Sequence, residues 1–171
     1  MRSKSSLKPL LTNAALAGAL AVSAAAAGAS KQFPKEGHYA FTACFSGVAS
    51  LIGFSKGFRG YSYELLGTNR SDEPGAIMDH TTFRCVGMNT SLGGKSTFDL
   101  LCEIKDSDGD EQLARIGMDA DGRQTRKVVA GTGKYEGMQM SGTIVPFKRF
   151  PSIKPGAVQA CNHQTGTYKL K

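Results

Sequence analysis

Two short segments of the sequence carry residue types that bind phosphates or metal ions in other proteins. In the first, Gly131-Thr132-Gly133-Lys134-Tyr135-Glu136-Gly137, three glycines surround a lysine. A phosphate-binding loop continues from Gly-Lys into Ser or Thr and opens a helix, and neither feature follows here. The glycine spacing also differs from that of a dinucleotide-binding fingerprint. We therefore interpret this segment as a turn between two strands, in which glycine permits a positive φ.

The second segment, Asp106-Ser107-Asp108-Gly109-Asp110, alternates carboxylates in a way that could supply oxygen ligands to Ca²⁺. An EF-hand loop, however, needs glycine at the position of Glu111 and a bidentate glutamate at that of Gly117. We expect a solvated hairpin turn and no metal site, with weak calcium binding as the alternative.

The histidines are the remaining candidates for acid–base chemistry. His38, His80 and His163 are scattered along the chain, and no Ser-His-Asp order or nucleophile elbow accompanies them. We assign no catalytic residue and no cofactor on this basis.

Alternating apolar and polar residues indicate the elements that must position any site. They predict strands over residues 38–46, 58–66, 81–89, 96–105, 112–118, 124–130, 136–147 and 158–170. Residues 47–57 are expected to form a turn or bend, and 67–75 a polar loop. Because no helical pattern survives, about eight strands separated by turns imply an all-β sandwich or barrel. Closure removes exposed sheet edges, so we predict a single eight-stranded antiparallel barrel.

The first residues have the pattern of a cleaved signal peptide. Arg2, Lys4 and Lys8 precede an uncharged Ala/Leu-rich run that ends in Ala27-Gly28-Ala29. We expect a signal peptide at 1–29, a linker at 30–37 and the barrel domain at 38–171. Cleavage leaves 18 basic and 14 acidic residues, so the net charge falls from +7 to +4. This predicts a bacterial protein that is periplasmic or secreted, has no transmembrane anchor after cleavage and does not bind nucleic acid.

The four cysteines form an even set, which in an oxidising compartment predicts two disulfides. Cys85 and Cys102 lie almost symmetrically about Gly93-Gly94, so they can face each other across a hairpin. Cys44 and Cys161 lie on the polar faces of the first and last strands, where a barrel closes. The rival pairings would join strands that are not expected to be neighbours.

The glycine segment also carries a family resemblance. Residues 129–137, followed by Ser141-Gly142-Thr143, resemble the "G-G-T-G-K-F/Y-x-G…G-x-G" segment of the allene oxide cyclase and dirigent-like β-barrels. The hairpin with Cys85 and Cys102 and the turn at 106–110 extend the resemblance over residues 83–143, closest to uncharacterised exported bacterial members. Ala130 replaces the first glycine. The resemblance implies an eight-stranded barrel with a cavity; no position matches the plant enzymes' functional residues, so it does not imply cyclase activity.

Strand alternation then predicts what lines the barrel. The residues we expect to contact a ligand are apolar, several with hydroxyl tips: Tyr39, Phe41, Tyr61, Tyr63, Phe98, Met118, Met138 and Met140. A basic surface is expected from Arg123, Arg126, Lys127, Lys148 and Arg149.

These residues favour a protein that binds a small apolar or aromatic molecule and is not an enzyme. One alternative is an isomerase or cyclase of the allene oxide cyclase type, which a titratable group buried in the cavity would favour. The other is a structural or envelope-associated interaction protein with a packed barrel. The oligomeric state is not predicted.

Overall fold

A computed structural model describes residues 33–147 and 150–171. The expected signal peptide at 1–29 and the first residues of the expected linker lie outside the described residues. The strands of the barrel are β1 (Glu36–Ser55), β2 (Phe58–Ser71), β3 (Thr81–Leu92), β4 (Lys95–Lys105), β5 (Glu111–Met118), β6 (Gln124–Gly131), β7 (Gln139–Pro146) and β8 (Ala157–Lys169).

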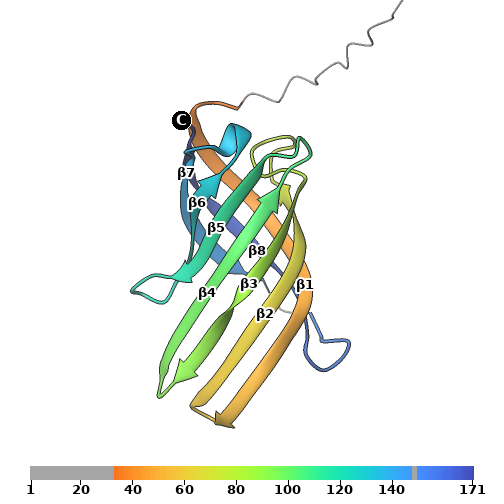
Figure 1. The fold of residues 1–171 in the computed structure, drawn as a ribbon, viewed down its shortest axis with the longest axis vertical. Helices are drawn as coiled ribbons and strands as arrows, with labels where there is room; N and C mark the ends of the chain where they lie inside the picture. Colours follow the sequence, from red (N-terminus) through yellow and green to blue (C-terminus); the bar gives the residue numbers. More distant parts are fainter. Residues whose placement is uncertain (1–32, 148–149) are drawn as a thin grey trace, which may run out of the picture. The chain divides into compact units, whose positions relative to one another are not determined.

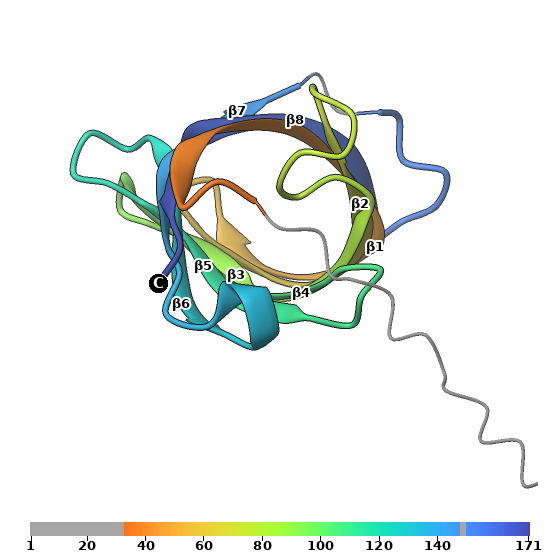
Figure 2. The ribbon, with the colours of Figure 1, turned by 90° about the horizontal axis from the view of Figure 1, so that it is seen from above.

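Each strand pairs antiparallel with the next, and β8 returns to pair with β1, which closes the barrel (Figures 1 and 2). The predicted fold class is therefore confirmed. In this part of the chain, no helix is long and apolar enough to cross a membrane. Since neighbouring residues of a strand point to opposite faces, closure sends one side chain of every two into the barrel.

Two strands are longer than the sequence pattern predicted. β1 continues to Ser55 through the segment expected to be a turn, and β2 continues to Ser71 through part of the expected polar loop. The extra residues of β1 pair with the start of β2, for example Leu51 with Tyr61. Together with the β3–β4 hairpin, they extend the wall at one end of the barrel (Figure 1).

The opposite end is closed by the loop between β2 and β3, which bends over the opening (Figure 2). Ile77 and Met78 from this loop are almost completely buried in the core. Asp79 holds the loop in place, because its carboxylate accepts hydrogen bonds from the backbone N–H groups of Ser71 (3.1 Å) and Gly75 (2.6 Å). The barrel is therefore a cup whose base is a folded loop.

Both predicted disulfides are present. Cys85 and Cys102 are directly paired across β3 and β4 and are buried inside the barrel. Cys44 and Cys161 are paired across β1 and β8 and join residues 117 positions apart in the sequence. The second bridge links the first strand to the last and so fastens the barrel where it closes.

The glycine segment connects β6 to β7 through the short 3-10 helix η1 (Gly133–Tyr135). The strand predicted to begin at Glu136 begins instead at Gln139, because the chain first makes this helical turn. Tyr135, within this turn, is buried. Gly133 has a φ of +51°, and a Cβ atom there would lie 1.9 Å from Asp110 Oδ1.

We predict that Gly133→Val lowers the free energy of unfolding by more than Gly109→Val does. Both glycines have positive φ, where an L side chain costs about 1–2 kcal/mol, but only Gly133 also has a neighbour within 4 Å of the added Cβ. Urea unfolding of the two variants measures the difference. Equal losses would show that the contact with Asp110 relaxes without cost.

Candidate functional site

The barrel encloses a cavity of about 610 Å³. Its lining reaches Leu51, Arg59 and Ser96 beside the β1–β2 and β3–β4 turns, where these side chains are exposed. The cavity therefore opens at the end opposite the loop that closes the barrel. A volume of this size falls in the range of pockets for small organic molecules.

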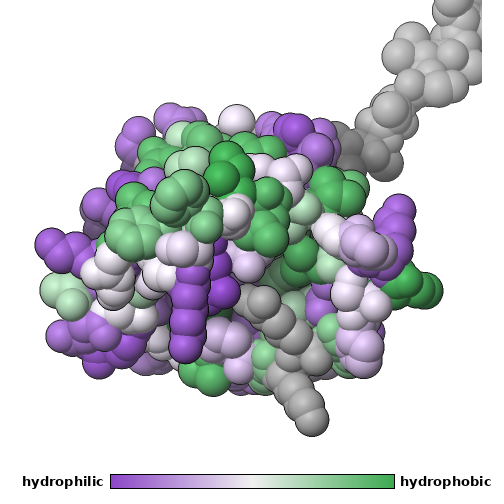
Figure 3. Space-filling model, turned by 90° about the horizontal axis from the view of Figure 1, so that it is seen from below, coloured by the Kyte–Doolittle hydropathy of each residue, from purple (hydrophilic) through white to green (hydrophobic). Residues whose placement is uncertain are grey.

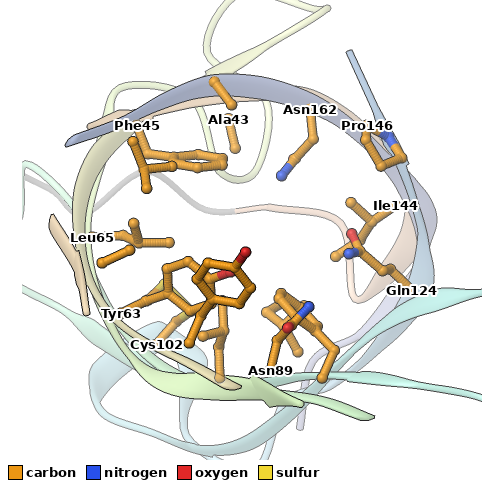
Figure 4. Close-up of a pocket in the computed structure, with 18 of the residues that line it drawn as sticks. Ala43, Phe45, Tyr63, Leu65, Asn89, Cys102, Gln124, Ile144, Pro146 and Asn162 are labelled. Carbon is orange, nitrogen blue, oxygen red and sulfur yellow. A yellow bond between two sulfur atoms is a disulfide. The ribbon is translucent and has the colours of Figure 1, made fainter. Parts of the chain in front are cut away.

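The cavity wall is mainly apolar and aromatic, with amides among the rings. Figure 4 shows Phe45, Tyr63 and Leu65 together with Asn89, Gln124 and Asn162 around the interior. Tyr61 and Tyr63 stack with their ring centroids 6.1 Å apart. The buried Cys85–Cys102 bridge also forms part of the wall. Rings supply the contact area for a flat molecule, and amides supply hydrogen bonds at its edges.

Arg126 is the one charged residue of the described chain that is buried over the whole residue, at 4% exposure. It projects inward from β6 and lines the cavity, so its prediction as part of a basic surface was wrong. The alternation of the strand places Arg126 on the same face as the buried Val128 and opposite the exposed Lys127. That parity was the available signal, since Val128 marks the inward face.

The surroundings of Arg126 contain no carboxylate that forms an ion pair with it among the described residues. Its Nη2 donates to Gln112 Oε1 (2.9 Å), and its guanidinium lies 5.7 Å from the ring centroid of Phe41. Burial lowers the pKa of Arg126 from 12.5 to about 10. This shift corresponds to about 3 kcal/mol against the charged form, although the guanidinium remains charged at neutral pH.

Gln112 connects Arg126 to the closed end of the barrel. Its Nε2 contacts Met78 Sδ (3.6 Å) in the β2–β3 loop and Met138 Sδ (3.3 Å) just before β7. Its carbonyl oxygen is thereby turned toward the arginine. The base of the cup thus holds the guanidinium in a fixed position below the cavity.

Three buried polar atoms near this position have no hydrogen-bond partner among the described residues: Tyr39 Oη, Arg126 Nε and Gln164 Oε1. Gln164 lines the cavity, and its Nε2 already donates to Asn162 Oδ1 (3.0 Å). Burial raises the pKa of Tyr39, and the nearby charge of Arg126 opposes that rise. Buried polar atoms are usually satisfied in native proteins, so these three mark a polar region beside the cavity that the protein's own side chains leave incompletely paired.

The structure divides the eight residues expected to contact a ligand between cavity, core and surface. Tyr61, Tyr63 and Phe98 line the cavity. The buried residues Tyr39, Phe41, Met138 and Met140 belong to the core and are not part of the cavity lining. Met118 is 38% exposed and lies near Gly122 in the β5–β6 turn.

The carboxylates of the segment considered for calcium gather around a lysine of the chain itself. Lys134 Nζ lies 2.8 Å from Asp106 Oδ2 and 3.6 Å from Asp110 Oδ2, and it also donates to Asp108. The aspartate segment 106–110 and the glycine segment 131–137 therefore contact each other, and the Lys134 ammonium group occupies the position between the carboxylates that a metal ion would take. Nowhere in residues 33–147 and 150–171 do His, Cys, Asp and Glu side chains gather into a metal-binding group.

Asp106 is the most buried member of this cluster. Burial alone would raise its pKa, but hydrogen bonds from Lys134 and Tyr135 outweigh that effect and hold the pKa below its ordinary value of 3.8. Burial raises the pKa of Tyr135, and the nearby negative charge of Asp106 raises it further. The cluster therefore fixes the β4–β5 turn to η1.

The histidines of the described chain do not enter the cavity lining. His163 Nε2 lies 3.0 Å from Asp72 Oδ2 near the surface, and its ring stacks on Phe147. His80 is exposed and contacts Arg70 at the closed end of the barrel. No described residue in the cavity lining is Asp, Glu, Lys or His.

A solved structure of a pterocarpan synthase dirigent protein is similar to this chain. The two share 12% identity with a TM-score of 0.47, and the match covers 82% of this chain and 94% of that chain. No protein-family model matches the sequence, and no curated protein matches it. Similarity at this level establishes neither family membership nor activity.

We predict that the free energy of unfolding decreases as the pH falls below about 4. Because the pKa of Asp106 is lower in the folded than in the unfolded chain, the unfolded state takes up its proton first, and acid favours unfolding. Urea unfolding between pH 2.5 and 6 measures this dependence, which should be weaker in Asp106→Asn. An unchanged pH profile in that variant would contradict the role given to the Lys134 cluster.

We also predict that millimolar CaCl₂ leaves the melting temperature unchanged, because the Lys134 ammonium group already occupies the position between the carboxylates. In Lys134→Met the carboxylates lose that charge, so any stabilisation by Ca²⁺ should be confined to this variant. Calcium stabilisation of the wild-type protein would show that the ion displaces the lysine.

Proposed function

We propose that this protein is exported and binds, within its barrel, a small and largely aromatic molecule that carries an anionic group. The observation that supports this most is the position of Arg126, a buried cation without an acidic partner at the inner end of an aromatic cavity. Export follows from the signal-peptide pattern at 1–29 and accords with two disulfides, so we place the protein in the bacterial periplasm or outside the cell.

The energetics of Arg126 favour an anionic partner. A buried arginine without a carboxylate carries a desolvation cost, and a stable fold does not need it, since an apolar residue would fill the same position. A carboxylate or phenolate oxygen at the inner end of the cavity would accept a charge-assisted hydrogen bond from the guanidinium of Arg126, which lines the cavity. The amide of Gln164 lines the cavity as well and adds a polar group at the same end.

The aromatic residues of the cavity wall indicate that the rest of the proposed ligand is a ring system. The stacked Tyr61 and Tyr63, together with Phe45, Phe83 and Phe98, provide ring surface between the arginine and the mouth. A ligand with its acidic group inward and its ring system toward the mouth would use both. The alternative of a structural protein with a packed barrel requires a filled interior, and the cavity of about 610 Å³ is against it.

The isomerase or cyclase alternative also draws support from Arg126. A buried cation can stabilise an oxyanion that develops when an epoxide or enone rearranges. General acid–base catalysis has fewer candidates, because no carboxylate or histidine is among the described cavity residues, which leaves the hydroxyl groups of Tyr61 and Tyr63 in the lining. We therefore place ligand binding first. A bound molecule recovered unchanged from protein purified from its own host, by native mass spectrometry, would favour binding over turnover.

A pair of fluorescent probes tests the proposal, since they share one ring system and differ by a sulfonate group: 8-anilinonaphthalene-1-sulfonate and its neutral parent, N-phenyl-1-naphthylamine. We predict that the wild-type protein binds the sulfonate more tightly. Arg126→Gln should weaken sulfonate binding at least about tenfold, as expected for a lost charge-assisted hydrogen bond, and should leave binding of the neutral probe unchanged.

The matched control is Arg59→Gln, which removes the same charge at the exposed mouth of the cavity. This variant should bind both probes nearly as the wild-type protein does. Equal wild-type affinity for the two probes, or equal loss of both in a folded Arg126→Gln variant, would contradict an anion-specific site. Near-UV circular dichroism of each variant establishes that it is folded.

A further inference from the structure

Two hairpin turns lie side by side at the open end of the barrel. The β1–β2 turn contains Lys56 and Gly57, and the β3–β4 turn contains Gly93 and Gly94. The N–H of Gly93 donates to the carbonyl oxygen of Gly57 (3.0 Å), so the two turns form one continuous edge. We call residues 51–59 and 91–95 the rim.

The rim exposes large apolar side chains. Ile52 is 78% exposed and Phe54 is 89% exposed, the two highest values among the large hydrophobic residues of the rim. Phe58 and Leu92 are exposed beside them and are directly paired across β2 and β3. Figure 3, which views the molecule from this end, shows hydrophobic side chains gathered there. Single exposed apolar residues are common, but a contiguous group of this kind indicates an interaction surface.

The charge of the rim has one sign. It carries Lys56, Arg59 and Lys95 and contains no aspartate or glutamate. The same holds for the longer segments 47–63 and 86–98 around it. The acidic residues of the nearest further turn, Asp119 and Asp121, are paired with Arg123. Exposed apolar side chains are therefore flanked by uncompensated positive charge.

We propose that the rim docks onto an anionic lipid surface, with Ile52, Phe54, Phe58 and Leu92 entering the interfacial layer and the three basic residues contacting lipid headgroups. Aromatic and aliphatic side chains partition into that layer, and long basic side chains reach the headgroups beside them. Each basic residue near an anionic surface contributes attraction equivalent to about a fivefold change in affinity.

Charge distinguishes this partner from a second copy of the chain. Two rims in contact would bring Lys56, Arg59 and Lys95 against the same residues of the other copy, and like charges in contact are unfavourable. The apolar side chains also project from turns and from the outer face of the strands, so a soft surface accommodates them without a matching pocket. Docking is independent of the proposed ligand, although Leu51 and Arg59 belong both to the rim and to the cavity mouth.

Sedimentation with lipid vesicles tests the proposal on residues 30–171, the mature chain expected after cleavage. We expect binding to vesicles of phosphatidylcholine with 30% phosphatidylglycerol (a composition of about the charge needed for electrostatic recruitment), and much weaker binding to pure phosphatidylcholine. The double variant Ile52→Ser/Phe54→Ser should reduce binding to the anionic vesicles at least tenfold. Lys56→Gln/Lys95→Gln should reduce it about 25-fold, from two fivefold contributions.

The control double variant is Leu66→Ser/Val129→Ser, which removes two apolar side chains that are 57% and 51% exposed on the outer wall, away from the rim. It should bind as the wild-type protein does. Equal binding to neutral and anionic vesicles, or equal binding by the rim and control variants, would overturn the proposal. So would lipid-free self-association that only the rim variants abolish, because the rim would then be a contact between copies.

Discussion

The pairing of the first strand with the last determines what every other residue of this protein faces. Once β1 and β8 join, the sheet is closed and each strand has one face toward the interior; at the mouth, residues 50–55 of β1 and 95–99 of β4 pair with a neighbouring strand on one side only. The interior is then filled unevenly. Large residues and the β2–β3 loop pack one end, while the hairpins at the other extend past the packed layer. A cup with a floor and a mouth is the result of closure combined with unequal strand lengths.

The floor of the cup combines features that are unfavourable for stability when taken singly. A guanidinium without an acidic partner, an unpaired tyrosine hydroxyl and an unpaired amide oxygen lie within one buried region. Elsewhere in the described chain, charges are either exposed or paired, as in the cluster of Lys134 with its three aspartates. The contrast between a lysine held by three carboxylates and a buried arginine without any is the physical basis for our proposal that Arg126 binds a ligand.

The sequence predicted the parts of the structure that depend on local pattern. Strand alternation, glycine turns and cysteine parity were sufficient for eight strands, the barrel and both disulfides. Residues 47–57 were misread because the tip of a hairpin beyond the packed layer has no core to face, so its apolar residues need not alternate. The burial of Arg126 was missed because a charged residue is assigned to the surface by type, although Val128 already marked the inward face of that strand.

The contact between Lys134 and the aspartates was also beyond the sequence pattern. The two segments are separated along the chain and are brought together by the register of β5 with β6, which includes a bulge near Leu113. A shift in that register moves the lysine along its partner strand, and no local signal fixes it. Strand alternation also could not predict which of the expected ligand residues lie in the cavity and which in the core. That division depends on how far the β2–β3 loop enters the barrel, and the sequence pattern does not define the path of this loop.

The Cys44–Cys161 bridge has a consequence for the order in which this chain acquires its shape. A chain that emerges from its N-terminus presents Cys44 first, and its partner in β8 follows 117 residues later. Cys85 and Cys102, only 17 residues apart, become available together and form their hairpin in the interval. Early formation of that hairpin removes both wrong partners for Cys44. The Cys85–Cys102 bridge thus leaves Cys161 as the remaining partner for the Cys44 thiol, and the barrel closes when β8 pairs with β1.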